Sequence, residues 1–132
     1  MASLRYAAGL EGIGDRTVDM LGGDIRVALV SSAYTPNALT HKFLSDITGI
    51  VARTPALTGK TFTGGVFDAD DATAPTVTGA VIVQLVGFLH TGSDATARLI
   101  WLNDTGTGLP FTPSGSNVPI AWDNASNKIF SL

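Results

Sequence analysis

The sequence predicts an all-β protein, an antiparallel β-sandwich or flattened barrel with a short N-terminal helix and one helical turn near residues 40–46. Its fifteen glycines and sixteen threonines supply the tight turns and β-branched residues that antiparallel sheets need. Short apolar or alternating segments recur between clusters of Gly, Pro, Asn and Asp. A chain of 132 residues suits one compact core, so we expect residues 1–132 to form a single β-rich domain.

Residues 1–16 are expected to form a helical arm. Apolar residues recur there at near-helical spacing, at Leu4, Ala7, Ala8 and Leu10. The glycines at positions 9, 12 and 14 each weaken a helix by about 1 kcal/mol relative to alanine. We therefore predict a short helix before Gly14 that depends on packing against the rest of the domain.

The first clear strand is Ile25–Val30, in which apolar residues alternate with Arg26 and Ala28. Thr17–Met20 is a candidate for a brief strand before it. After a loop, the pattern predicts one helical turn over Thr40–Asp46, with Thr40 as a possible N-cap. Strand signals then follow at Gly49–Ala56 and Lys60–Phe67, and near the end of the chain at Val118–Trp122 and Lys128–Leu132.

Two nearly continuous apolar runs, Ala80–Leu89 and Ala97–Leu102, predict a hairpin at the centre of the protein. A strand with one solvent-exposed face should alternate between apolar and polar residues, whereas a strand that is buried on both faces need not. We therefore expect a second layer of the domain, or a partner subunit, to cover the outer face of this hairpin.

The strand over Ala80–Leu89 is also the predicted interaction surface. Successive strand residues point to opposite faces, and Gln84 marks the even-numbered face as the one toward a partner or solvent. We therefore predict Ile82, Val86 and Phe88 as interface residues, with Tyr34 and Leu109 as further candidates in two loops. On this view Ile82→Asp leaves a folded monomer that no longer binds, whereas Val83→Asp breaks the fold.

The composition favours association with other proteins. Only 14% of the residues are charged, against roughly 25% in ordinary soluble domains, and the mean hydropathy is +0.29. The eight basic residues are scattered singly and the net charge is −3, which argues against nucleic-acid binding. The longest apolar stretch falls short of the roughly 20 residues of a membrane span, and the N-terminus lacks the apolar region of a secretory signal.

Motifs for catalysis or cofactor binding are missing from the sequence. There is no cysteine, no nucleophile elbow and no phosphate-binding loop, so we expect neither an enzyme nor a cofactor. The two histidines, His41 and His90, lack partners at metal-ligand spacing. The acidic cluster of Asp68, Asp70 and Asp71 is a weak candidate for a cation site, and a solvated acidic turn is the alternative interpretation.

The two tryptophans leave one further class of function open. Trp101 and Trp122 would suit a carbohydrate-binding module if their rings were exposed on one face for stacking on a sugar. Each lies within an apolar strand, however, which favours packing in the core or at an interface.

Several short blocks, taken in order, resemble small structural proteins of tailed bacteriophages and prophages. The longest is Asp24–Asn37, followed by Thr40–Asp46. The resemblance runs from about Thr17 to the end, and its specificity comes from the number and order of the blocks, because none is a catalytic signature. The chain departs from the family pattern at Ala72–Pro75, where relatives have an aromatic residue. The remaining blocks are Leu57–Thr61, Gly65–Asp71, Thr91–Thr96, Gly108–Pro113 and Ile120–Phe130.

The resemblance implies a β-rich component of the virion, assembled in the host cytoplasm. We expect a capsid decoration or cement protein that binds the major capsid protein and forms homo-oligomers. A tail, neck or fibre-base subunit is the alternative within the particle, and a carbohydrate-binding module is a more distant one. Copy number separates the first two, since cementing takes on the order of hundreds of copies and a neck ring about a dozen or fewer.

Overall fold

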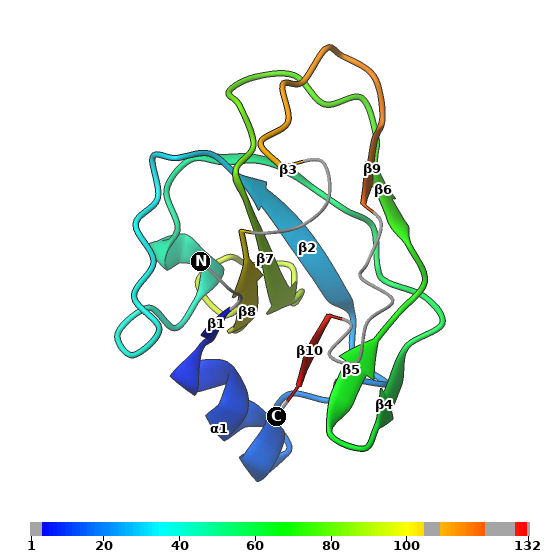
Figure 1. The fold of residues 1–132 in the computed structure, drawn as a ribbon. Helices are drawn as coiled ribbons and strands as arrows, with labels where there is room; N and C mark the ends of the chain where they lie inside the picture. Colours follow the sequence, from blue (N-terminus) through cyan, green and yellow to red (C-terminus); the bar gives the residue numbers. More distant parts are fainter. Residues whose placement is uncertain (1–3, 105–108, 121–128, 132) are drawn as a thin grey trace.

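The computed structural model describes residues 4–104, 109–120 and 129–131. This part of the chain is mostly β, with antiparallel sheets, one short helix and one 3-10 turn, which confirms the predicted fold class. Its strands form layers and do not close into a barrel (Figure 1).

The largest layer is a five-stranded antiparallel sheet in the order β1-β8-β7-β2-β3. Strand β7 lies at its centre and pairs with β2 along its whole length, from Ile25 opposite Leu89 to Val30 opposite Gln84. Its other neighbour is β8, so the predicted central hairpin is confirmed. The strands are β1 (Leu4–Arg5), β2 (Ile25–Val30), β3 (Ile50–Arg53), β7 (Gln84–Leu89) and β8 (Leu99–Asn103).

Two smaller sheets form a second layer beside the large one (Figure 1). Strands β4 (Thr61–Thr63) and β5 (Val66–Asp68) make a hairpin with β10 (Phe130–Ser131) at the far edge of β5, and β6 (Ala72–Ala74) pairs with β9 (Val118–Ile120). Gly64 and Gly65, with φ of +60° and +78°, turn the β4–β5 hairpin in the way that a two-residue turn requires. The segment predicted as one strand, Lys60–Phe67, therefore folds back on itself.

Both faces of the large sheet are buried by the same chain. On one face, side chains of β2, β7 and β8 meet those of the smaller sheets; the rings of Phe67 and Trp101 lie there with their centroids 5.7 Å apart. On the other face, Val86 and Phe88 of β7 pack against Tyr34, Leu44 and Ile47 from the segment 31–47. The continuous apolar runs thus reflect two-sided burial, as predicted, and the cover is a layer of this domain.

Helix α1 (Ala7–Asp15) packs against β8 at Gly9. A Cβ atom on Gly9 would lie 2.6 Å from both the Ile100 Cα and the Leu99 carbonyl oxygen, so only glycine permits this close approach. The short helix is confirmed, although it extends past Gly14 to Asp15. It ends at Arg16, which adopts a left-handed conformation with φ of 70°.

The predicted helical turn is present as the 3-10 helix η1 (Leu44–Asp46). Thr40 does not cap it. The Asp46 carboxylate instead accepts hydrogen bonds from the backbone N–H groups of Lys42, at 2.8 Å, and Phe43, at 3.1 Å. These bonds fix the chain just before the turn and hold the pKa of Asp46 below its ordinary value.

Two further segments differ from the sequence prediction. Thr17–Met20 forms a loop rather than a strand: the Thr17 N–H donates to the Asp15 carboxylate and the Val18 N–H to the Gly12 carbonyl, so neither amide pairs with a neighbouring strand. The apolar run from Ala80 becomes a regular strand only at Gln84. No helix among the described residues is long and apolar enough to cross a membrane.

Candidate interaction surface

The predicted interface residues of the central strand are covered within the chain. Ile82 is 1% exposed, and Val86 and Phe88 are fully buried. The prediction that a partner covers them is therefore wrong, because the segment 31–47 folds back over Val86 and Phe88. The sequence showed that this face needed cover but did not show which part of the chain supplies it.

Ile82 does not even share a face with Val86 and Phe88. Its backbone exchanges two hydrogen bonds of 2.8 Å with Phe111, and its side chain packs in the cluster on the opposite face of the sheet. Because the regular strand begins only at Gln84, strict alternation cannot be extended back to residue 82.

Gln84 has an internal role. Its buried side-chain amide donates hydrogen bonds to the carbonyl oxygens of Ser31, at 3.0 Å, and Tyr34, at 3.1 Å. The polar residue in the apolar run therefore holds the covering segment onto the sheet and does not mark contact with a partner.

Tyr34 is likewise buried, in a chain of side-chain hydrogen bonds. Its hydroxyl lies 2.8 Å from the Tyr6 hydroxyl and 2.8 Å from Nδ1 of His41. Burial raises the pKa of both tyrosines. This network ties the covering segment to the N-terminal arm, so the candidate interface residue Tyr34 is a structural one. Leu109, the other loop candidate, is half-buried against the core between the large sheet and the two smaller sheets.

Trp101 is a core residue. It is fully buried, and its ring lies over Gly87, where an added Cβ atom would come within 2.1 Å of the indole. A sugar cannot stack on such a ring, which removes Trp101 as a carbohydrate platform. Trp122 lies outside the described residues.

The acidic cluster does not assemble into a metal site. In the described part of the chain, no three His, Cys, Asp or Glu side chains gather as ion ligands would. Asp70 instead lies against Gly59 and is 3.4 Å from the Thr58 hydroxyl, while the Asp70 backbone N–H donates to the Thr58 carbonyl at 2.8 Å. Asp68 is half-buried, and Asp71 is exposed.

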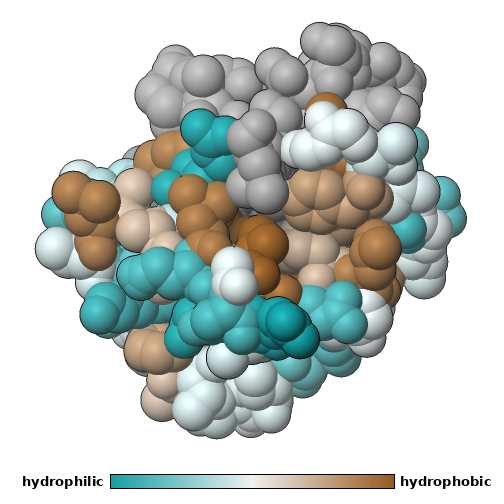
Figure 2. Space-filling model, turned by 90° about the horizontal axis from the view of Figure 1, so that it is seen from below, coloured by the Kyte–Doolittle hydropathy of each residue, from teal (hydrophilic) through white to brown (hydrophobic). Residues whose placement is uncertain are grey.

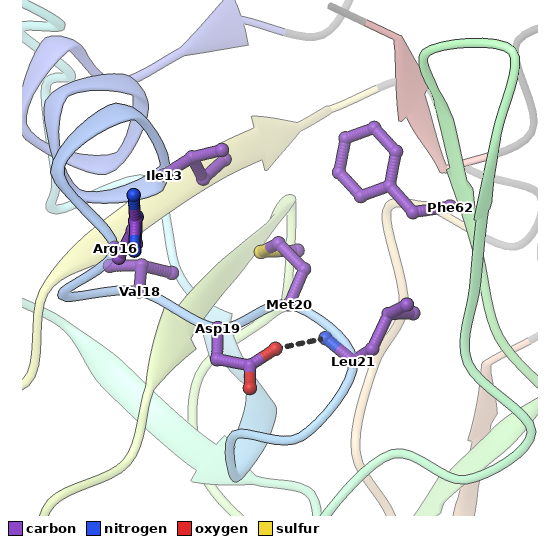
Figure 3. Close-up of a pocket in the computed structure, with 7 residues that line it drawn as sticks. All are labelled: Ile13, Arg16, Val18, Asp19, Met20, Leu21 and Phe62. Carbon is purple, nitrogen blue, oxygen red and sulfur yellow. Dashed lines mark hydrogen bonds between the residues drawn. The ribbon is translucent and has the colours of Figure 1, made fainter.

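An apolar pocket of about 470 Å³ opens on a different face, between the end of α1, the loop that follows it, and β4. Figure 2 shows this face with hydrophobic side chains gathered near its centre and hydrophilic ones below them. In Figure 3, Ile13 and Val18 approach from the helix side and Phe62 from the hairpin, with Met20 and Leu21 between them. The remaining lining residues are Arg16 and Asp19.

The pocket loop is held in shape by its own polar groups. The Asp19 carboxylate accepts hydrogen bonds from the backbone N–H groups of Leu21, at 3.1 Å, and Gly22, at 2.9 Å (Figure 3 draws the first). These bonds keep the pKa of Asp19 below its ordinary value, so the carboxylate is ionised at neutral pH. Leu21 is left 52% exposed at the pocket edge.

Sequence reasoning missed this pocket. The sequence makes Thr17–Met20 a candidate for a brief strand, which would bury these residues in a sheet. A signal was nevertheless present, because Met20 and Leu21 are large apolar residues directly before the turn residues Gly22 and Gly23. Apolar residues in a surface turn are exposed unless something packs on them.

The chemistry of the pocket suits contact with an apolar group. Its lining offers one carboxylate and one guanidinium among five apolar side chains, and concave apolar sites of this size typically receive an apolar anchor. Comparison of the sequence with protein-family models and with curated proteins found no match.

Proposed function

We propose that this chain is a structural subunit of a tailed-bacteriophage particle, a capsid decoration protein that binds the major capsid protein on the outside of the head. The ordered blocks from about Thr17 to the end of the sequence support the phage assignment. The observation that carries a binding role is the open apolar pocket with half-exposed Leu21 beside it. Such surfaces on soluble domains mark sites of protein contact.

The self-covered sheet also supports this proposal. Both faces of the central strands are buried without a partner, so the subunit can fold before it meets a particle. A decoration protein needs this property because it is added to a shell that already exists. We therefore assign the contact surface to the pocket and the exposed loops instead of the central strand.

Electron cryomicroscopy of the phage particle that encodes this chain tests the proposal. We expect density for the subunit over the whole head, in on the order of hundreds of copies arranged by the head symmetry. About a dozen copies or fewer at the neck or tail would overturn the decoration role in favour of the tail, neck or fibre-base alternative. Absence of the chain from purified particles would overturn the virion assignment itself.

A further inference from the structure

A chain of three hydrogen-bonded side chains joins the covering segment, residues 31–47, to the N-terminal arm. The Tyr34 hydroxyl lies 2.8 Å from the Tyr6 hydroxyl and 2.8 Å from Nδ1 of His41. Tyr6 is fully buried, whereas His41 lies half-buried at the outer end of the chain. Histidine is the side chain that usually changes its charge between about pH 5 and pH 8. The outer end of a buried network is therefore a group that can gain a proton.

The number of protons in this chain fits a neutral His41. With the imidazole proton on Nε2, Nδ1 is an acceptor, so Tyr6 donates to Tyr34 and Tyr34 donates to His41. The imidazolium carries a proton on both nitrogens, which places three protons along two contacts. The backbone N–H of Asn37 is a further donor toward the Tyr34 oxygen. Protonation of His41 in this position would therefore leave a buried donor without an acceptor, which is unfavourable.

A charged His41 has a second partner nearby at Asp46. The Asp46 carboxylate on η1 is close enough for its charge to act on the histidine. Its Oδ2 accepts the backbone N–H groups of Lys42 and Phe43, and no described residue donates to its Oδ1. The other groups around the histidine are the two tyrosines and the exposed Lys42, while β7 and β8 contribute apolar side chains to this layer. Asp46 is thus the anion that an imidazolium would meet.

We propose that His41 is a pH-dependent latch between the covering segment and the N-terminal arm. When it is neutral, its Nδ1 accepts the Tyr34 hydroxyl proton and completes the chain to Tyr6. When it is protonated, the ring turns from Tyr34 to the Asp46 carboxylate, and water replaces it as the acceptor for Tyr34. The latch belongs to the free subunit, so it goes beyond the proposed function and is tested without any phage particle.

Opening of the latch should be confined to the contact that it holds. The Ala7 N–H, next to Tyr6, donates to the Ala38 carbonyl of the covering segment at 2.9 Å. Farther along that segment, the Leu44 N–H donates to the Ala97 carbonyl at 2.8 Å, in a contact that includes neither tyrosine nor histidine. We therefore expect the Ala7 amide to report the latch and the Leu44 amide to be its internal control.

Amide hydrogen exchange of the purified full chain, measured by NMR at about pH 7.5 and about pH 5.5, tests the latch. A released, solvated histidine titrates near pH 6.5, so over this range it favours the open state about tenfold. After correction for the intrinsic pH dependence of exchange, protection of the Ala7 amide should fall by about that factor at the acidic pH. Protection of the Leu44 amide should not change. Equal protection of the Ala7 amide at both pH values would overturn the proposal.

Three variants assign the response to its groups. His41→Asn places an amide oxygen near the Nδ1 position without a titrating group, so Ala7 protection should be the same at both pH values. His90→Asn is the matched control for the other histidine and should keep the wild-type response. Asp46→Asn keeps an oxygen for the two backbone N–H groups but loses the charge, so its response should be smaller. A full response in His41→Asn or in Asp46→Asn, or none in His90→Asn, would contradict the latch.

The ring nitrogens of the wild-type protein give a test without any substitution. Long-range ¹⁵N–¹H NMR spectra distinguish the two neutral tautomers of histidine from each other and from the imidazolium. At about pH 7.5 we expect His41 to carry its proton on Nε2, with Nδ1 as the bare acceptor for Tyr34. An Nδ1-protonated ring, or a charged one, at that pH would show that the hydrogen bonds do not run as proposed.

Discussion

Single residues set the closest contacts of this fold, and Gly87 is the clearest case. It lies in the middle of the central strand with the indole of Trp101 directly above it, where a Cβ atom would be 2.1 to 2.3 Å from three ring carbons. Neither group can move easily, because the glycine is in a paired strand and the ring is fully buried. A side chain at position 87 therefore forces the core to shift.

Gly87→Ala should accordingly destabilise the protein by about 1–3 kcal/mol, the usual cost of overpacking a core. Gly14→Ala is the control: a Cβ atom there meets nothing within 4 Å, and alanine favours a helix, so stability should rise by up to about 1 kcal/mol. Urea denaturation midpoints measure both changes. A Gly87→Ala protein as stable as wild type would show that the strand and the indole pack less tightly than described.

The two neighbours Ile82 and Val83 give a second test at this scale. Ile82 is buried and Val83 only half-buried, so the sequence-based expectation for these residues is reversed. Ile82→Asp should unfold the domain or cost more than about 4 kcal/mol, because it places an unpaired carboxylate in the core. Val83→Asp should cost clearly less. Thermal melts decide, and a stable Ile82→Asp protein would contradict the structure at this bridge to Phe111.

At the scale of elements, the segment 31–47 is the part that completes the domain. It contains little regular structure. Gln84 and the tyrosine pair hold its first part, and backbone hydrogen bonds, such as that from the Leu44 N–H to the Ala97 carbonyl at 2.8 Å, hold its second part. Its contribution is to bury the second face of the large sheet. An element held in this way should open independently of the strands beneath it.

Replacing Gln84 with leucine tests that independence. The change keeps the approximate side-chain volume but leaves the carbonyl oxygens of Ser31 and Tyr34 without their donor, at a cost of about 1–3 kcal/mol. We expect amide hydrogen exchange in residues 31–47 to become faster. Protection of the amides in β2 and β7 should decrease only by the amount that the global free energy of unfolding decreases. Equal loss of protection everywhere would mean that the segment and sheet unfold as one unit.

The elements also show what the sequence could predict. Alternation in Ile25–Val30 and the continuous runs around Val86 and Ile100 located the large sheet, since those patterns come directly from local burial. The pairing of β6 with β9 was missed because it joins residues far apart in the chain, such as Ala72 and Ile120, and carries no local signal. The covering segment and the pocket were missed for the same reason, as both depend on contacts between distant parts of the chain.

At the scale of the whole molecule, the buried tyrosine pair sets the upper pH limit of stability. Burial raises the pKa of Tyr6 and Tyr34 above the ordinary value of 10.0, so the folded state keeps protons that the unfolded state releases. The stabilisation is complete below about pH 10 and is lost as the pH rises further. We expect the melting temperature to fall steeply above that pH.

Tyr6→Phe should be less stable than wild type at pH 7, because the hydrogen bond between the two hydroxyls is lost. Its melting temperature should nevertheless decline less steeply above pH 10, since one of the two buried phenols no longer titrates. Melts from pH 7 to about pH 12 measure both slopes. Parallel curves for the two proteins would show that Tyr6 titrates as an ordinary exposed tyrosine does.

The layer that residues 31–47 add to the sheet has a thermodynamic consequence for assembly. In the subunit role proposed above, the central strands are already covered before binding, so association carries no conformational entropy cost for ordering them. Its negative heat-capacity change should be small and set by the area around the pocket alone. On that proposal, calorimetry at several temperatures would give a nearly constant binding enthalpy, and a particle could add or lose single subunits without unfolding of their central strands.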